Sequence, residues 1–138
     1  MSDPFLDTSV IIRLITGDDP AKQQRAVALF EQVEQRALTL VAPDTVIADA
    51  VFVLTSKRIY NLPRTEVAAK LTTLVRLPNF RVKHRAAVLR ALALFGTATQ
   101  LDFGDALQVA MMQQAKASLI YSFDTDFDGI PGVTRREP

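Results

Sequence analysis

Near its N-terminus the chain reads Pro4-Phe5-Leu6-Asp7-Thr8-Ser9 and then places apolar residues at positions 10, 11, 14 and 15. The first residues are typical of a short buried strand, and the spacing that follows is typical of a helix. The chain therefore opens with a strand that leads directly into a helix. This order predicts the α/β class, in which helices connect the strands of a mostly parallel sheet.

The same alternation continues along the chain. Asp19 and Pro20 supply a cap and a first residue for a helix over residues 21–35. Strand patterns cover residues 39–42, 80–83 and 119–123. Further helical patterns begin at Pro43, lie on either side of residues 80–83 and cover residues 103–115. We expect one domain over residues 1–138, with three α/β/α layers and a central, mostly parallel sheet of four or five short strands.

The composition excludes several classes of protein. The chain has 138 residues, 49% of them hydrophobic, and no cysteine. Disulfide scaffolds, thiolate zinc sites and cysteine nucleophiles are therefore excluded, and a reducing compartment, most simply the cytoplasm, is expected. Apolar stretches are far shorter than the roughly 20 residues that span a bilayer, and no signal-like segment is present, so neither membrane insertion nor secretion is expected.

Charge is unevenly distributed along the sequence, although the net charge is only +1. Residues 57–90 hold nine basic side chains and one acid, Glu66, whereas residues 102–128 hold five aspartates and one base, Lys116. Gathered aspartates suit a hard cation, and a separate basic surface suits a polyanion. Solvated helix faces and helix caps explain the same counts equally well.

Two aspartates follow strands, where open α/β sheets bind ligands. Asp7 ends the first strand and Asp124 follows the strand of residues 119–123. Their carboxylates converge if the two strands are neighbours. Each aspartate is an equally good helix N-cap.

Three further aspartates lie on expected helices. Asp49 is the only charged residue between Thr45 and Ser56, so we expect apolar neighbours around it and a cation, a donor network or a solvated cleft to compensate its charge. Asp102 and Asp105 are three residues apart at a helix start, so capping and the helix dipole explain both acids. If one of them is functional, it is Asp105, because Asp102 is read as the cap.

Other chemistries find no support in the sequence. His84 is the only histidine and is read as a surface residue, so a catalytic triad or a histidine metal site is not expected. The five scattered glycines form no phosphate-binding pattern.

Four segments carry a family resemblance in their order and spacing. They are Phe5-Leu6-Asp7-Thr8-Ser9, the acid in the helix after Pro43, Asp102-Phe103-Gly104-Asp105-Ala106-Leu107, and Ser122-Phe123-Asp124-Thr125-Asp126-Phe127 with Ile130-Pro131-Gly132-Val133 after it. The chain resembles the PIN-domain ribonucleases and, within them, the virulence-associated protein C toxins of toxin–antitoxin pairs. The resemblance spans nearly the whole chain and implies a PIN-like fold.

The resemblance also implies a metal site. Asp7, Asp49, Asp105 and Asp124 would hold one or two Mg²⁺ or Mn²⁺ ions for hydrolysis of phosphodiester bonds, with Asp126 assisting through water. Ser9 would hydrogen-bond a carboxylate or a substrate phosphate, although a helix cap explains it equally well. The family usually has Glu where this chain has Asp49, which is one methylene shorter.

The implied substrate is RNA, single-stranded or looped. Arg58, Arg64, Arg81 and Arg85 are the candidate RNA contacts, with solvated helix faces as the alternative. The toxin resemblance further implies a homodimer and a small cognate antitoxin that blocks the cleft. Two other functions stay open: an inactive PIN-like module that binds RNA or protein, and a nuclease that cuts DNA.

Overall fold

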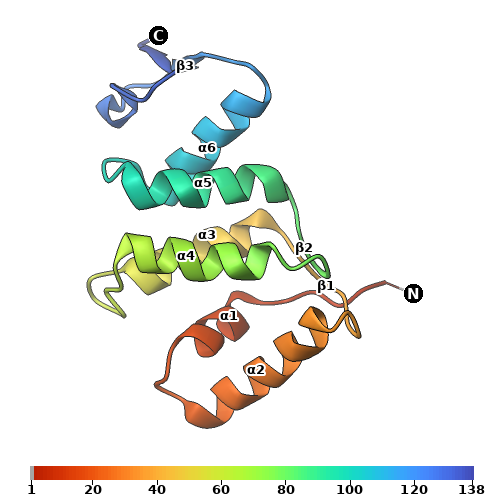
Figure 1. The fold of residues 1–138 in the computed structure, drawn as a ribbon. Coiled ribbons are helices and arrows are strands. Elements are labelled where there is room, and N and C mark those ends of the chain that lie inside the picture. Colours follow the sequence, from red (N-terminus) through yellow and green to blue (C-terminus); the bar gives the residue numbers. More distant parts are fainter. Residues whose placement is uncertain (1) are drawn as a thin grey trace.

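The computed structural model describes residues 2–138, and its secondary structure alternates short strands with longer helices (Figure 1). In chain order the elements are α1 (Thr8–Ile15), α2 (Pro20–Glu34), β1 (Leu40–Ala42), α3 (Asp44–Thr55), α4 (Arg64–Val75), β2 (Phe80–Val82), α5 (Arg85–Thr97), α6 (Phe103–Gln114), β3 (Leu119–Tyr121), the 3₁₀ helix η1 (Thr125–Phe127) and β4 (Thr134–Arg136). Within this part of the chain, no helix combines the length and the apolar character needed to cross a bilayer.

The strands pair in parallel, as expected for the α/β class. β1 pairs with β2 in the register Leu40 to Phe80, and β3 pairs with β4 in the register Leu119 to Thr134. Phe5 forms an isolated parallel bridge to Val41. The α/β class is therefore confirmed, but the described strands form two separate two-stranded sheets where one continuous sheet was expected.

Helix starts follow the caps in the sequence. Asp19 accepts the N–H of Lys22 at 3.1 Å, and Pro20 is the first residue of α2, as predicted. Asp102 likewise caps α6 by accepting the N–H of Asp105 at 2.8 Å. These local interactions were predictable because capping depends only on residues within one helical turn.

Two apolar clusters hold the molecule together. The main core joins α1 to α5 and includes Phe30 and Phe80, whose rings meet edge to face at 5.6 Å. The first half of α6 belongs to this core through Phe103, Ala106 and Ala110. A second cluster fastens the C-terminal segments to the other side of α6; its buried members are Leu101, Val109, Ile120, Phe127 and Ile130.

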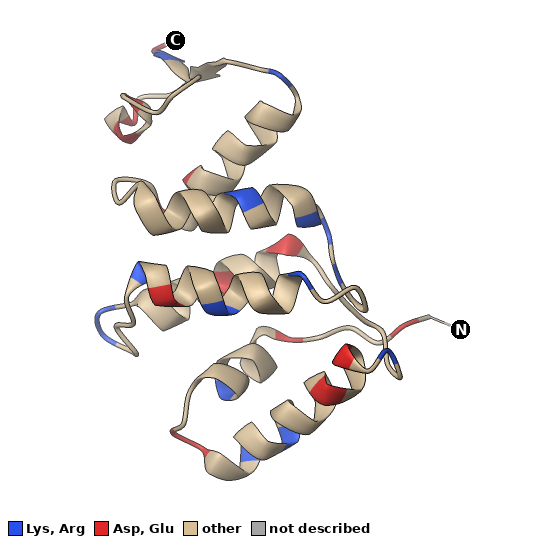
Figure 2. Cartoon of the chain, viewed as in Figure 1, with Lys and Arg blue, Asp and Glu red and all other residues tan. Residues whose placement is uncertain are grey.

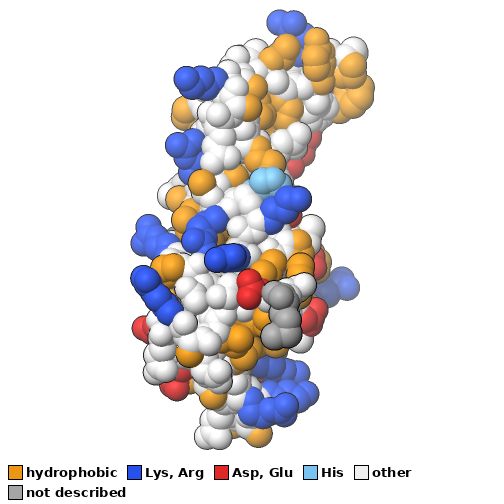
Figure 3. Space-filling model, turned by 90° about the vertical axis from the view of Figure 1, so that its right-hand side faces the viewer, with side chains coloured by type: hydrophobic (Ala, Val, Ile, Leu, Met, Phe, Trp, Pro, Cys, Tyr) orange, Lys and Arg blue, Asp and Glu red, His pale blue; other side chains and the backbone are white. Residues whose placement is uncertain are grey.

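This packing gives an elongated molecule. α1 and α2 lie at one end, the segment around Phe5 and α3 to α5 lie between the ends, and β3 with η1 lies at the other end (Figure 1). The space-filling view is elongated in the same direction (Figure 3). The strand around Phe5 therefore does not neighbour β3, whose partner is β4. The convergence of Asp7 and Asp124 depended on that neighbourhood, and it is absent because α6 packs on α5 and carries β3 away from the first strand.

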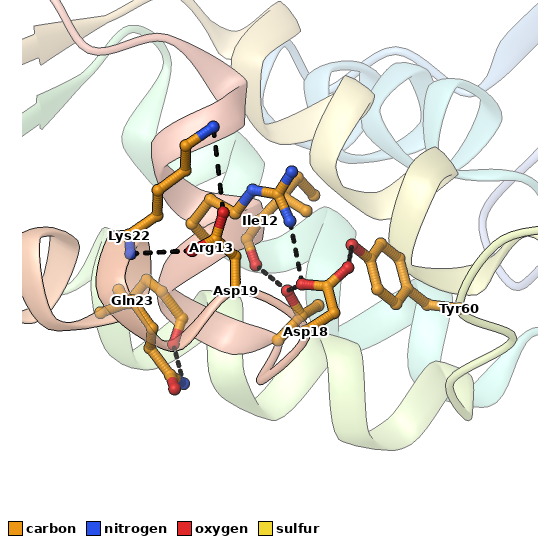
Figure 4. A network of polar contacts seen from close by, with 9 residues as sticks. Ile12, Arg13, Asp18, Asp19, Lys22, Gln23 and Tyr60 are labelled. Carbon is orange, nitrogen blue, oxygen red and sulfur yellow. Dashed lines mark hydrogen bonds and ion pairs between the residues drawn. The ribbon is translucent and has the colours of Figure 1, made fainter.

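A polar network braces the turn between α1 and α2 (Figure 4). Asp18 accepts hydrogen bonds from Arg13 and Thr16 at 2.9 Å each and from the Tyr60 hydroxyl at 2.5 Å. The Tyr60 bond first, and the Thr16 bond second, hold the pKa of Asp18 below its ordinary value of 3.8. The carboxylate thus links the first helical hairpin to the segment after α3.

Replacing Asp18 by Asn is expected to lower the melting temperature at pH 7. A carboxylate whose pKa is lowered by folding stabilises the folded state above its unfolded pKa, and this contribution is lost as the pH falls through the folded pKa. The difference between wild type and Asp18→Asn should therefore be full above the ordinary value of 3.8 and shrink below it. Thermal melts from pH 7 to pH 2.5 check this, and a difference that persists unchanged at the acid end contradicts it.

Candidate functional site

Three aspartates gather at the end of the molecule that carries β3. Asp105 lies in the first turn of α6, Asp124 precedes η1 and Asp126 lies within η1. One carboxylate oxygen from each lies within 4.8 Å of those of the other two. Figure 2 shows the acidic positions of η1 facing the start of α6. We call these three residues the acidic cluster.

Local hydrogen bonds position the acidic cluster. The Asp102 carboxylate accepts a hydrogen bond from the N–H of Asp105 and so fixes the first turn of α6. The N–H of Asp124 donates to the Ser122 hydroxyl at 2.9 Å, and the N–H of Asp126 donates to Asp124 Oδ1 at 2.8 Å. Each capping carboxylate uses one oxygen for its cap, which leaves the second oxygen free to bind a ligand.

The carboxylates raise one another's pKa. Burial first, then the charges of Asp102 and Asp124, raise the pKa of Asp105 to about 6. The pKa of Asp126 is raised mainly by the charge of Asp124. A divalent cation would relieve this repulsion, and several carboxylate oxygens are the donors that hard cations prefer. The donor set therefore fits Mg²⁺ or Mn²⁺.

Asp7 is a helix cap outside this cluster. Its Oδ2 accepts the N–H of Ser9 at 3.0 Å. The hydroxyl of Ser9 first, and its N–H second, hold the pKa of Asp7 below its ordinary value of 3.8. Ser9 thus stabilises the ionised Asp7 carboxylate by hydrogen bonding. Both residues are exposed at the start of α1.

Asp49 lies on the exposed side of α3, so its carboxylate is not buried among apolar neighbours, and solvation is the one of the expected compensations that the structure shows. The buried positions of this helix are Val46, Ile47, Ala50, Val51 and Leu54. Position 49 projects away from that face, and its stripe continues to Phe52, which is 70% exposed. No hydrogen bond or ion pair engages Asp49 within residues 2–138, so water solvates its charge without a compensating partner.

Two of the four candidate arginines are occupied inside the fold. Arg64 donates from Nε to the Phe95 carbonyl at 2.9 Å, donates from Nη2 to the carbonyls of Ala98 and Leu101, and lies over the Phe95 ring at 3.6 Å. Arg85 donates from Nη2 to the Leu77, Pro78 and Phe80 carbonyls. These two partly buried guanidinium groups fasten chain segments through their hydrogen bonds to carbonyl groups.

The other two candidate arginines are exposed. Arg58 lies in the turn after α3, and Arg81 lies on β2 with its guanidinium 3.9 Å from Asp3. Figure 2 shows further basic positions on α4, on α5 and in the connection that leads from β2 to α5. His84 is also exposed, and its Nδ1 lies 2.9 Å from Asp44 Oδ2.

A basic groove that no sequence pattern predicted lies between α1 and α2. A cavity of about 400 Å³ between α1 and α2 is lined by Arg13, Lys22 and Arg25 over an apolar floor, and it reaches Ser9. These three side chains are dispersed in the sequence, so they form no local pattern as conspicuous as the dense basic run of residues 57–90. Only the packing of α1 on α2 brings them together.

Arg64→Ala is expected to lower the free energy of unfolding by about 2 kcal/mol, because it removes charged hydrogen bonds and leaves carbonyl groups unpaired. Arg58→Ala, at an exposed position, is the matched control and is expected to change stability by less than about 0.5 kcal/mol. Urea denaturation measures both. Equal stabilities of the two variants would contradict a structural role for Arg64.

Asp105→Asn is expected to raise the melting temperature of the metal-free protein at pH 7.5. The pKa of Asp105 in the folded state, about 6, exceeds its ordinary value of 3.8, so stability is lost as the pH rises between these values. Asn carries no charge and avoids this loss.

Asp128→Asn is the control, because Arg135 lowers the pKa of Asp128 and the change should reduce the melting temperature at pH 7.5. Thermal melts in EDTA measure both variants. A lower melting temperature for Asp105→Asn at pH 7.5 would contradict a destabilising effect of the ionised Asp105 carboxylate.

Comparison with known proteins covers nearly the whole chain. The PIN domain family matches residues 5–133, a span that contains Asp7, Asp49 and the acidic cluster. No curated protein matches the chain. The extent of the family match agrees with the parallel α/β fold and with aspartates at helix starts and after strands. The chain therefore belongs to the PIN domain family.

Proposed function

We propose that the protein is a metal-dependent endoribonuclease that hydrolyses RNA phosphodiester bonds. Membership of the PIN domain family indicates nuclease-type activity in general. The observation that carries the proposal is the acidic cluster of Asp105, Asp124 and Asp126, with carboxylate oxygens within 4.8 Å of one another. Gathered carboxylates without basic partners are typical of sites for a hard divalent cation.

The acidic cluster would hold Mg²⁺ or Mn²⁺. When bound, such an ion polarises the phosphodiester and makes water a better nucleophile. The residues of the chain orient the ligands: Asp102 holds the turn that carries Asp105, and Ser122 holds the backbone of Asp124. Asp105 is mostly ionised above pH 6, which is the form that binds a cation.

Asp7 and Asp49 enter the proposal as further ligands, and Ser9 as a hydroxyl that orients Asp7 or a substrate phosphate. The family match that includes them and the hydrogen bond from Ser9 to Asp7 support these roles. Both acids are exposed and have room for a ligand.

RNA binding would use exposed basic side chains, chiefly Arg58 and Arg81, because Arg64 and Arg85 are engaged with carbonyl groups. Phosphate contacts of this kind bind without reading sequence. The order of the motifs favours a toxin of a toxin–antitoxin pair, restrained by a small antitoxin protein.

Cleavage of a mixed pool of structured and single-stranded RNA tests the proposal. Wild-type protein is expected to cleave the pool with Mg²⁺ or Mn²⁺ and not in EDTA. Asp105→Asn and Asp124→Asn should each reduce the rate at least 100-fold, because each removes a ligand charge from the proposed site. Matched DNA should remain intact.

The control variant is Asp128→Asn, which removes an equal charge from the same segment outside the acidic cluster and should retain most of the activity. Circular dichroism checks the folding of each variant. Cleavage that persists in EDTA, or in folded Asp105→Asn, would overturn the metal-dependent mechanism.

The separation of Asp7 and Asp49 from the acidic cluster favours a second candidate, a PIN-like module that binds RNA or protein without cleaving it. It predicts RNA binding by wild-type protein with no cleavage in any metal. Cleavage gained in Asp49→Glu would indicate that the shorter side chain at position 49 had reduced the activity.

A further inference from the structure

The acids assigned to the proposed site lie in two groups. Asp7 and Asp49 belong to the half of the molecule built on α1 and α3, whereas the acidic cluster belongs to the end that carries β3. Among residues 2–138, the carboxylates whose oxygens gather within 4.8 Å of one another are those of Asp105, Asp124 and Asp126, and neither Asp7 nor Asp49 is among them. Something must bring the two groups together if they form one site.

The strand around Phe5 has an open edge. The N–H of Leu6 donates to the Val41 carbonyl, and the N–H of Val41 donates to the Pro4 carbonyl, both at 2.9 Å. Because backbone groups alternate between the two edges of a strand, those of Phe5 point away from β1. No strand pairs with that edge within residues 2–138, and the Phe5 side chain is 71% exposed.

β3 has a matching open edge at the end of the molecule opposite α1 and α2. The N–H of Ser122 donates to the Arg136 carbonyl, and the Ser118 carbonyl accepts the N–H of Thr134, so the backbone groups of Leu119 and Tyr121 point to the other edge. Tyr121 is 62% exposed and Phe123 is 73% exposed. Figure 3 shows hydrophobic side chains gathered at this end of the space-filling view. Open edges beside exposed aromatic residues favour strand addition.

Packing prevents these edges from meeting within one chain. α6 is part of the main core through Phe103, Ala106 and Ala110, and β3 is fastened to α6 through Ile120 in the second apolar cluster. Moving β3 to Phe5 would separate buried surfaces, which is costly. A second copy related by a two-fold axis needs no such rearrangement, because the two edges lie far apart in an elongated molecule and each copy offers both (Figure 1).

We propose that two copies assemble through reciprocal strand addition, in which the strand around Phe5 of each copy pairs with β3 of the other. The Asp7 carboxylate of one copy then meets the acidic cluster of the other, so that each active site is shared between two chains. The shared site rests on the function proposed above, whereas the strand pairing does not. A second copy is favoured over an unrelated partner for two reasons. It supplies a strand edge for each open edge, and it brings Asp7 to the acidic cluster.

Cysteine pairing tests the assembly without any measurement of activity. The chain has no cysteine, so Phe5→Cys and Tyr121→Cys each introduce a single thiol. Neighbouring strands bring paired positions close enough for a disulfide, whose Cα atoms lie roughly 4.4–6.8 Å apart. Mild oxidation of the two variants mixed is expected to give a covalent heterodimer, and Leu119→Cys in place of Tyr121→Cys covers the adjacent register.

Phe5→Cys mixed with Thr73→Cys, an exposed position on α4, is the control and should give no more than background linkage. The double variant Phe5→Cys/Tyr121→Cys should link between chains. A disulfide formed within one chain, or equal linkage in the control mixture, would overturn the proposal.

Complementation then tests the shared site. Asp7→Asn and Asp105→Asn, each inactive alone, should together recover about a quarter of wild-type activity, because half of the dimers in an equal mixture are mixed and each has one intact site. An active wild type whose mixed variants stay inactive would overturn the shared site and leave the nuclease proposal standing. An inactive wild type that still gives the disulfide heterodimer would overturn the nuclease proposal and leave the assembly standing.

Discussion

The contact between α5 and α6 determines where the C-terminal third of the chain lies. Phe95 and Phe103 meet edge to face with their ring centroids 6.2 Å apart, and Ala106 and Ala110 continue the contact along α6. Arg64 holds the connection between the two helices through its bonds to the Phe95, Ala98 and Leu101 carbonyls. Because β3 and η1 are fastened to the opposite side of α6, this contact also places the acidic cluster.

The acidic cluster is locally unfavourable because it brings three carboxylates close together, and the rest of the fold holds them in place. Burial first, and like charges at short distance second, raise the pKa of Asp105, so holding this carboxylate ionised costs stability. The scaffold tolerates it because Asp124 and Asp126 are exposed to water and because their backbone is held by hydrogen bonds. A site that is strained when empty is suited to a cation, since binding removes the repulsion.

The aspartates of the family motifs serve both local structure and the proposed chemistry. Asp7, Asp102 and Asp124 each accept a backbone N–H at the start of a helical turn. A cap uses one oxygen and fixes the carboxylate relative to the helix, so capping and ligand binding are compatible in one residue. A cap in the sequence is therefore no reason to discount a functional role.

The sequence by itself determined the order and class of the elements, because spacing and capping act within a few residues. The helix over residues 21–35 corresponds to α2, the caps at Asp19 and Asp102 formed as expected, and the strands at residues 39–42 and 80–83 pair in parallel. Only the tertiary structure decided which aspartates meet, that Asp49 is solvated, and that Arg64 and Arg85 are used internally. β4 also went unforeseen, because Thr134–Arg136 has no apolar pattern and forms a strand only beside β3. These outcomes depend on contacts between residues far apart in the chain, which no local pattern encodes.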